Sequence, residues 1–117
     1  MINRNEIKMN NQLKERLFKF LQTCDNYRGR KIIIKESITT NKDNYNRHFT
    51  SFSELEFTLL SCSARISGGR AMFLGDKLSY EIAIDITVDL IEIDELNFEL
   101  IEKYSESIYR KSELSFE

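Results

Sequence analysis

The segment from Tyr80 to Leu90 alternates large apolar residues with small or polar ones, and this regularity constrains the fold more than any other feature. A period of two is typical of a strand that buries one face. The pattern therefore predicts one continuous strand over 80–90. Its polar face holds Glu81, Ala83, Asp85, Thr87 and Asp89, and its apolar face should form the centre of the core through Ile82, Ile84, Ile86 and Val88.

The segment after this strand is predicted to be a helix over 94–111. Asp94 is a suitable N-cap, acidic Glu95 follows in the first turn, and Arg110 and Lys111 lie in the last turn, as the helix macrodipole favours. The pairs Glu99–Lys103 and Glu106–Arg110 have i,i+4 spacing, which stabilises helices. A buried stripe would be formed by Phe98, Ile101, Tyr104 and Ile108.

Three elements are predicted before residue 50. Leu13, Leu17, Leu21 and Cys24 recur at helical spacing and indicate an amphipathic helix over 10–24, preceded by a flexible extension over 1–9. The β-branched run 31–35 predicts a buried strand. The polar, asparagine-rich stretch 39–48 is predicted to be a loop.

Residues 50–66 fit either a helix or a strand, and we favour a strand because Ser67, Gly68 and Gly69 would turn it into a hairpin with 70–74. Gly75 and Asp76 then form a second turn. The segment from Arg65 to Arg70 could also bind an anion through its glycine amides, but a plain hairpin turn is the better interpretation. The predicted fold is a single α+β domain over 1–117, with a small antiparallel sheet of about four strands flanked by an N-terminal and a C-terminal helix.

Composition limits the chemistry of the chain. At 117 residues it is long enough to bury a core without a metal or a disulfide, and Cys24 and Cys62, which match no metal or redox spacing, are expected to be free buried thiols. A single histidine, His48, disfavours a metal site, and no cofactor motif is present. No apolar run is long enough for a membrane span, and the polar start lacks a signal-peptide pattern, so the expected location is cytoplasmic.

Charge is distributed unevenly along the sequence. Residues 1–50 hold eleven Lys and Arg against five Asp and Glu, whereas residues 51–117 hold six against fourteen. The basic half, from Lys8 to Lys35, could contact phosphates, but a sequence pI near 5.5 disfavours nucleic-acid binding. Head-to-tail association of copies through opposite charges is a further possibility.

The acidic half supplies the candidate site. On one strand, Glu81, Asp85 and Asp89 would stand roughly 13 Å apart, too far to share a proton or a metal. His48 has no activated nucleophile beside it in the sequence, so no catalytic residue is assigned and the protein is expected not to be an enzyme. A row of carboxylates can instead face a basic protein surface, and we assign partner binding to Glu81, Asp85, Asp89, Glu92, Glu95 and Glu99.

Three functional hypotheses follow. The first is a small inhibitor or immunity-type protein that masks a basic partner surface. The second is a secretion-type chaperone, because a small acidic chain with a helix-flanked sheet resembles type III secretion chaperones, a resemblance that implies a homodimer. The third is a subunit of a phage ring or connector, and the Asn, Ile and Lys bias of the first half hints at bacterial phage or mobile-element DNA.

Overall fold

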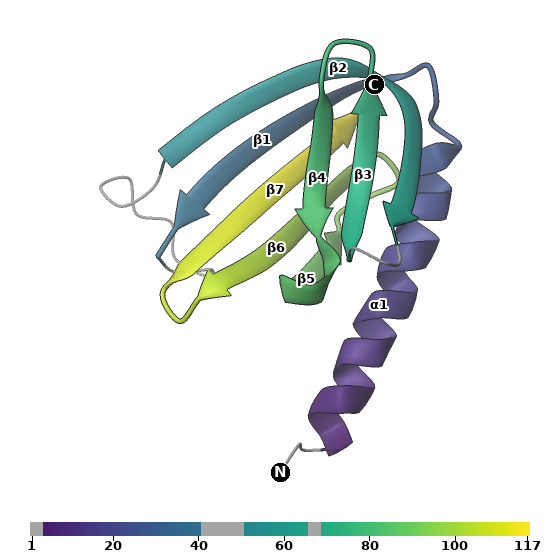
Figure 1. Ribbon diagram of the computed structural model, residues 1–117. Helices are drawn as coiled ribbons and strands as arrows, with labels where there is room; N and C mark the ends of the chain where they lie inside the picture. Colours follow the sequence, from purple (N-terminus) through teal and green to yellow (C-terminus); the bar gives the residue numbers. More distant parts are fainter. Residues whose placement is uncertain (1–3, 41–50, 66–68) are drawn as a thin grey trace.

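The structure is a computed structural model that describes residues 4–40, 51–65 and 69–117, and the side chains from Gln12 onward. These residues form one helix and one antiparallel sheet of seven strands in the order β4-β3-β2-β1-β7-β6-β5 (Figure 1). The elements are α1 (Arg4–Asp25), β1 (Lys31–Thr39), β2 (Ser51–Arg65), β3 (Arg70–Gly75), β4 (Ser79–Ala83), β5 (Thr87–Glu92), β6 (Asn97–Ser105) and β7 (Ile108–Phe116).

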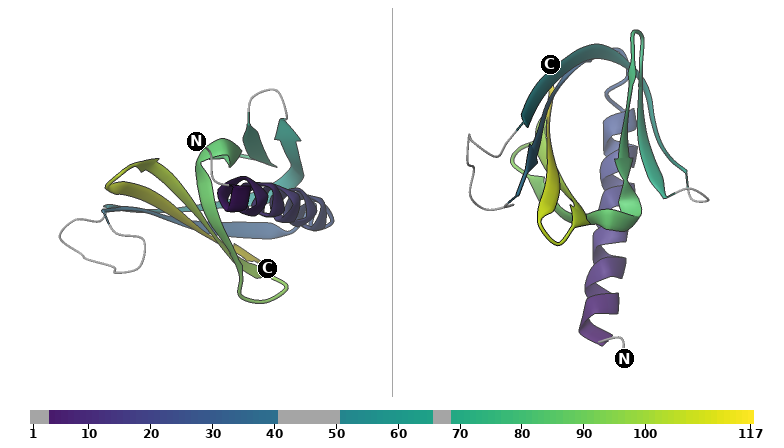
Figure 2. Two further views of the ribbon diagram at one scale, coloured as in Figure 1. Left: turned by 90° about the horizontal axis from the view of Figure 1, so that it is seen from below. Right: turned by 60° about the vertical axis from the view of Figure 1, so that its left-hand side comes forward.

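The long strand β2 bends the sheet around the helix. Its first half pairs with β1 and its second half with β3, and the register shifts between Leu59 and Ser61. Figure 2 shows β2 arching so that the β3–β4 hairpin faces the other strands, with α1 along the open side and its N-terminal end projecting beyond the strands. Phe20 of α1 connects both halves, because its ring centroid lies 6.3 Å from that of Phe73 in β3 and 4.8 Å from that of Phe98 in β6.

The core lies between the helix and the concave face of the sheet. Helix α1 contributes Leu17, Phe20, Leu21 and Cys24, which follow the predicted helical spacing. The inward-facing residues of the strands alternate with outward-facing ones, as a one-sided sheet requires. They include Ile32, Ile34, Phe57, Leu59, Phe73, Ile82, Leu90, Leu100, Leu114 and Phe116.

The predicted continuous strand over 80–90 is wrong. Strand β4 ends at Ala83, a 3-10 turn labelled η3 covers Ile84–Ile86, and β5 begins at Thr87. The turn carries the chain from one edge of the sheet to the other, since β4 and β5 are the two outermost strands. It is fixed by hydrogen bonds from the Ile84 amide to the Gly69 carbonyl at 2.7 Å and from the Thr87 hydroxyl to the Ala83 carbonyl at 2.8 Å.

This break changes the predicted centre of the core. Ile82 and Ile84 are buried as expected, but Ile86 is only half-buried and Val88 is exposed. Leu90 returns to the core from β5. The alternation therefore belongs to two short strands and the turn between them.

The predicted helix over 94–111 is also wrong, because this segment forms β6 and the beginning of β7. The two strands pair as an antiparallel hairpin in which Phe98 faces Leu114 and Leu100 faces Ser112. Tyr104 and Ile108, predicted to be buried, are exposed, whereas Phe98 and Ile101 are buried. The predicted four-strand sheet with two flanking helices is consequently replaced by a seven-strand sheet with a single helix.

The predictions for the other helices and strands agree more closely with the structure. Helix α1 is confirmed but begins at Arg4 rather than at residue 10, β1 continues to Thr39, and 51–65 is a strand. The hairpin between β2 and β3 is confirmed by the pairing of Arg65 with Arg70, and Gly69 has a φ of 58°, which favours glycine. Residues 41–50, which include most of the predicted loop and His48, lie outside the described residues, as do 66–68.

The break in the 80–90 segment can be tested with two truncations. Ile82→Ala should lower the free energy of unfolding by about 2–5 kcal/mol, because it opens a cavity at a fully buried position. Val88→Ala should change it by about 0.5 kcal/mol or less, because Val88 is 41% exposed. Urea unfolding measures both, and comparable losses would indicate the continuous strand instead.

Candidate functional site

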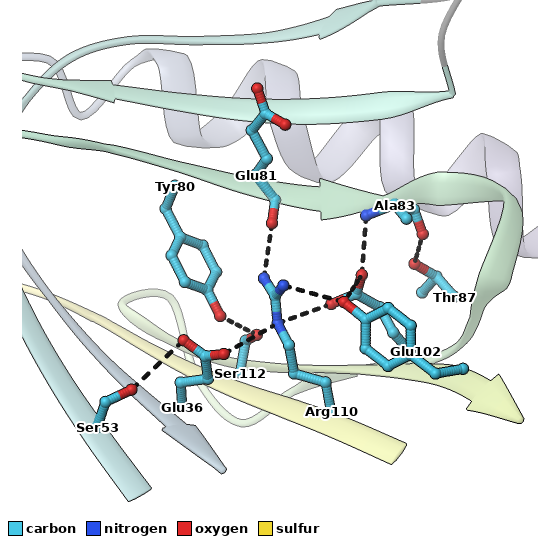
Figure 3. A network of polar contacts seen from close by, with 10 residues as sticks. Glu36, Ser53, Tyr80, Glu81, Ala83, Thr87, Glu102, Arg110 and Ser112 are labelled. Carbon is cyan, nitrogen blue, oxygen red and sulfur yellow. Dashed lines mark hydrogen bonds and ion pairs between the residues drawn. The ribbon is translucent and has the colours of Figure 1, made fainter. Parts of the chain in front are cut away.

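A fully buried carboxylate, Glu102 on β6, is the centre of a polar network inside the bent sheet (Figure 3). Its Oε2 atom accepts a hydrogen bond from the Ala83 amide of β4 at 2.9 Å. Its Oε1 atom lies 3.1 Å from Nε of Arg110 on β7, where the N–H direction is too poor for a hydrogen bond, so this contact is an ion pair. Glu102 thus links β4 to the β6–β7 hairpin.

Arg110 makes the second link from β7 to β4. Its Nη2 donates to the Glu81 carbonyl at 2.6 Å, and its guanidinium lies 4.7 Å from the centre of the Tyr80 ring. The Tyr80 and Ser112 hydroxyls are hydrogen-bonded at 2.7 Å, and the Glu36 carboxylate lies 3.6 Å from Nε of Arg110. Ser53 of β2 donates to the Glu36 carboxylate at 3.4 Å, so five strands, β1, β2, β4, β6 and β7, contribute to the network (Figure 3).

Burial shifts the pKa values of these groups. Desolvation raises the pKa of Glu102 above its usual range, although the Ala83 amide and Arg110 oppose the change. Desolvation also raises the pKa of Tyr80 to about 12. Burial alone would lower the pKa of Arg110, but its neighbours, Tyr80 and Glu102 foremost, raise it.

The contacts of this network indicate a structural role. The polar atoms of Glu102, Arg110 and Tyr80 meet backbone groups, one another, or the hydroxyl groups of Tyr104 and Ser112. A general acid or base must reach a proton on a substrate, and a buried carboxylate that accepts a strand amide is directed away from solvent. We therefore interpret the network as the connection that joins the edge of β4 to the β6–β7 hairpin, and we call this connection the closure of the sheet.

Charged side chains also cover two other free strand edges, both beside α1. Arg16 of α1 donates to the Leu90 carbonyl of β5 at 2.6 Å, and Asp25 accepts from the Cys62 amide of β2 at 2.9 Å. Uncovered edges would offer templates for pairing with other chains. These contacts therefore protect the sheet against edge-to-edge association at these positions.

The structure separates the first three predicted site residues. Glu81 lies on β4, Asp85 in the η3 turn and Asp89 on β5, so they do not form one row of carboxylates on a single strand. Asp85 lies 3.8 Å from the ammonium group of Lys14 on α1, and Glu81 supplies its backbone carbonyl to the buried network. The predicted acidic face is thus divided between opposite edges of the sheet.

The other three predicted residues lie at the β5–β6 end of the sheet. Glu92 ends β5, Glu95 lies in the following turn, and Glu99 lies on β6 with its carboxylate 3.5 Å from the ammonium group of Lys111. We call Ile91, Glu92, Ile93, Asp94 and Glu95 the acidic tip. All five are exposed, and Ile93 is the most exposed large apolar residue among them at 60%.

Several hydrogen bonds hold the acidic tip in place. The Asp94 carboxylate accepts from the Leu96 amide and from the Asn97 side chain, which also keeps the pKa of Asp94 below its usual range. The Ile93 and Asp94 amides donate to the Asn97 carbonyl, and the Tyr27 hydroxyl donates to the Glu95 carbonyl at 2.9 Å. The exposed Ile93 side chain is therefore presented on an ordered turn.

The basic half of the chain lies partly against acidic groups. Lys14 pairs with Asp85, Arg28 with Asp25, and Lys31 with Glu56 and Glu117. The charge separation along the sequence is therefore reduced in space, because strands from both halves are neighbours. Carboxylates therefore neutralise several of the basic side chains that were candidates for phosphate binding.

The structure adds two facts about ligands and membranes. Within residues 4–40, 51–65 and 69–117, no three His, Cys, Asp or Glu side chains come together as a potential metal-binding group. In the same part of the chain, no helix is both long enough and apolar enough to cross a membrane.

Sequence reasoning missed Glu102, Arg110 and Ile93. Both Glu102 and Arg110 fall in the predicted helix over 94–111, outside its buried stripe, and charged residues are rarely buried unless paired. The sequence signal for two strands was the period of two in each segment: one set is Phe98, Leu100 and Glu102, and the other is Ser112, Leu114 and Phe116. Ile93 lies between the predicted strand over 80–90 and the predicted helix over 94–111, so no predicted element assigns it a face.

Comparison with known proteins leaves the assignment to the structure itself. No protein-family model matches the chain, and neither the curated proteins nor the solved structures give a significant match.

The buried ion pair predicts a pH-dependent cost of losing the arginine. Arg110→Met should lower the free energy of unfolding at pH 7 by about 3–5 kcal/mol, because it leaves the Glu102 charge buried without its cation. Because the pKa of Glu102 is raised in the folded protein, the folded state binds the carboxyl proton more tightly than the unfolded state does. The resulting contribution to the free energy of unfolding is fully present below the unfolded pKa and is lost as the pH rises through the folded pKa. The deficit relative to the wild type should therefore shrink toward pH 4.

Arg65→Met is the matched control, because Arg65 is an exposed arginine on β2, and it should change stability by about 0.5 kcal/mol or less at either pH. Urea unfolding of the two variants at pH 7 and pH 4 provides the measurement. An Arg110→Met deficit that is equally large at both pH values would show that Glu102 carries no costly charge.

Proposed function

We propose that this protein is a non-enzymatic protein-binding module, of the inhibitor or immunity type, that docks its acidic tip on a basic surface of a protein partner. One observation carries the proposal: Ile93, 60% exposed, projects from an ordered turn between exposed carboxylates. Carboxylates steer a basic partner into place, while burial of an exposed apolar side chain adds affinity on contact.

The surroundings of the acidic tip support this proposal. Beside it lies a shallow depression of about 300 Å³, whose lining includes Ile93, Phe98, Glu99 and Glu113. In the part of the chain that the structure describes, Glu92 and Glu95 make no ion pair, so both carboxylates are available to an incoming cation. A lysine or arginine of the partner could thus meet carboxylates on either side of Ile93.

Order in the turn also favours binding. The loss of loop freedom on association costs free energy, and a turn that is already held by Asp94, Asn97 and Tyr27 avoids part of that cost. The proposal keeps Glu92, Glu95 and Glu99 as binding residues with Asp89 at the margin. It leaves Glu81 and Asp85 out, since both lie on other elements and Asp85 pairs with Lys14.

The alternative hypotheses lose part of their basis. The likeness to type III secretion chaperones depended on a sheet flanked by two helices, which is not the architecture observed. The ring or connector hypothesis depended on separated charges, several of which pair within the chain. We therefore develop neither of them here.

The proposal predicts how charge reversal at the acidic tip affects a partner. A photoreactive residue at position 93 should capture the partner, whereas the same residue at the exposed Leu74 of β3 should not. With the captured partner, Glu92→Lys combined with Glu95→Lys should weaken binding at least about tenfold, mainly by slowing association, because like charges then meet. Wild-type association should slow as salt rises, since screening shortens the reach of charge to about 8 Å at physiological ionic strength.

The matched control is Glu54→Lys with Glu106→Lys, which changes the net charge equally at two exposed positions outside the tip. It should leave affinity within about twofold of the wild type, since charges beyond a screening length contribute little. Binding that ignores both the tip reversal and the salt concentration would count against the proposal. If the partner is an enzyme, its inhibition by the wild type and not by the reversed variant distinguishes an inhibitor from a simple binder.

A further inference from the structure

The fold brings together two cysteines that are distant in the sequence. Cys24 lies in the last turn of α1, and Cys62 lies on β2 just after its register shift. Asp25, the residue next to Cys24, accepts a hydrogen bond from the Cys62 amide at 2.9 Å, so the two backbones are neighbours. Both side chains are free thiols that belong to the same buried hydrophobic cluster.

The two thiols differ in their access to solvent. Cys24 is fully buried, whereas Cys62 is 7% exposed. A depression of about 280 Å³ between α1 and β2 is lined by Phe18, Gln22 and Cys62 among others, so Cys62 borders a space that is open to small molecules. The contact with Cys62, together with burial, raises the pKa of the Cys24 thiol, which keeps that group protonated.

We infer that Cys24 and Cys62 form a reversible intramolecular disulfide when the protein meets a hydroperoxide. The Cys62 thiolate attacks the peroxide and breaks its O–O bond, which forms a sulfenic acid and a hydroxide, and the hydroxide becomes one water with the proton that the Cys62 thiol released. The Cys24 sulfur then attacks the Cys62 sulfur, and the departing hydroxide leaves as a second water with the Cys24 proton. Two thiols lose two electrons in total, and one hydrogen peroxide is reduced to two waters.

The consequence is a covalent connection between the end of α1 and β2. The Asp25 hydrogen bond is the polar contact that already joins these elements there, and the disulfide would fix the same junction. Because oxidised α1 could no longer separate from β2, opening of this end of the molecule would depend on the redox conditions. The modification lies on α1 and β2, apart from the acidic tip, and is independent of the proposed function.

The first test is oxidation of the folded wild-type protein with hydrogen peroxide. Monomeric protein should lose about 2 Da and both free thiols, and a reductant should restore them. Peptide mapping should show the Cys24–Cys62 link. Retention of both thiols, a link only between two molecules, or direct conversion of Cys62 to sulfinic acid would each overturn the inference.

Single variants test the order of the steps. In Cys24→Ala, Cys62 should accumulate as a sulfenic acid that a dimedone reagent traps. In Cys62→Ala, the fully buried Cys24 should react at least about tenfold more slowly, because reactivity follows exposure and thiolate character. Equal rates in the two variants would contradict the role of Cys62 as the first sulfur to react.

An equilibrium measurement reports the stability of the disulfide independently of how fast an oxidant reaches the two thiols. The wild type is brought to equilibrium in mixtures of reduced and oxidised glutathione, once folded and once in urea. The folded chain should be half-oxidised at a ratio of reduced to oxidised glutathione at least about tenfold higher than the unfolded chain, because the fold holds the sulfurs together. Equal ratios would show that the fold does not favour the disulfide.

Discussion

The ion pair between Glu102 and Arg110 is the interaction on which the arrangement of the strands depends. Strand β4 has one neighbour, β3, so its other edge presents the Glu81 carbonyl and the Ala83 amide toward the interior. Buried backbone groups without partners are costly, and no strand is available to pair with them. Arg110 of β7 supplies the missing donor and Glu102 of β6 the missing acceptor, and their opposite charges lower the cost of burying each other. The bent sheet can therefore close without a complete ladder of strands.

The contacts of Glu102 and Arg110 with β4 also affect the chain that follows β4, where the η3 turn leads to β5 at the other edge of the sheet. The η3 turn starts directly after Ala83, whose amide Glu102 holds, and it delivers the chain to β5. Strand β5 in turn is covered by Arg16 of α1 and leads into the acidic tip, where Asp94, Asn97 and Tyr27 order the turn. A buried network thus determines where the exposed carboxylates and Ile93 emerge from the sheet. The candidate binding surface is a product of the closure rather than of one acidic strand.

The sequence predicted the helix α1 and the strands β1 to β3 because their periodicity and glycine turns are local signals. It did not predict the crossing at Ile84, since the apolar alternation continues through a turn whose position is fixed by distant residues, Gly69 and Glu102. The β6–β7 hairpin was mistaken for a helix for a related reason. Its charges have helical spacing in the sequence, yet Glu99 pairs with Lys111 and Glu102 with Arg110 across two strands. Likewise, Glu92 and Glu95 were identified as acidic, but their separation from Glu81 depends on the sheet order.

The Glu102 carboxylate takes the place of a neighbouring strand at the edge of β4. Amide hydrogen exchange at Ala83 measures this most directly, because its N–H has the carboxylate as its acceptor. The account predicts that this amide exchanges in the wild type as slowly as the ladder amide of Ile82. In Glu102→Ala, the Ala83 amide should exchange at least about tenfold faster relative to the amide of Leu114, which reports on unfolding of the distant part of β7. Fast exchange of Ala83 in the wild type, or no change in that ratio in the variant, would contradict the account.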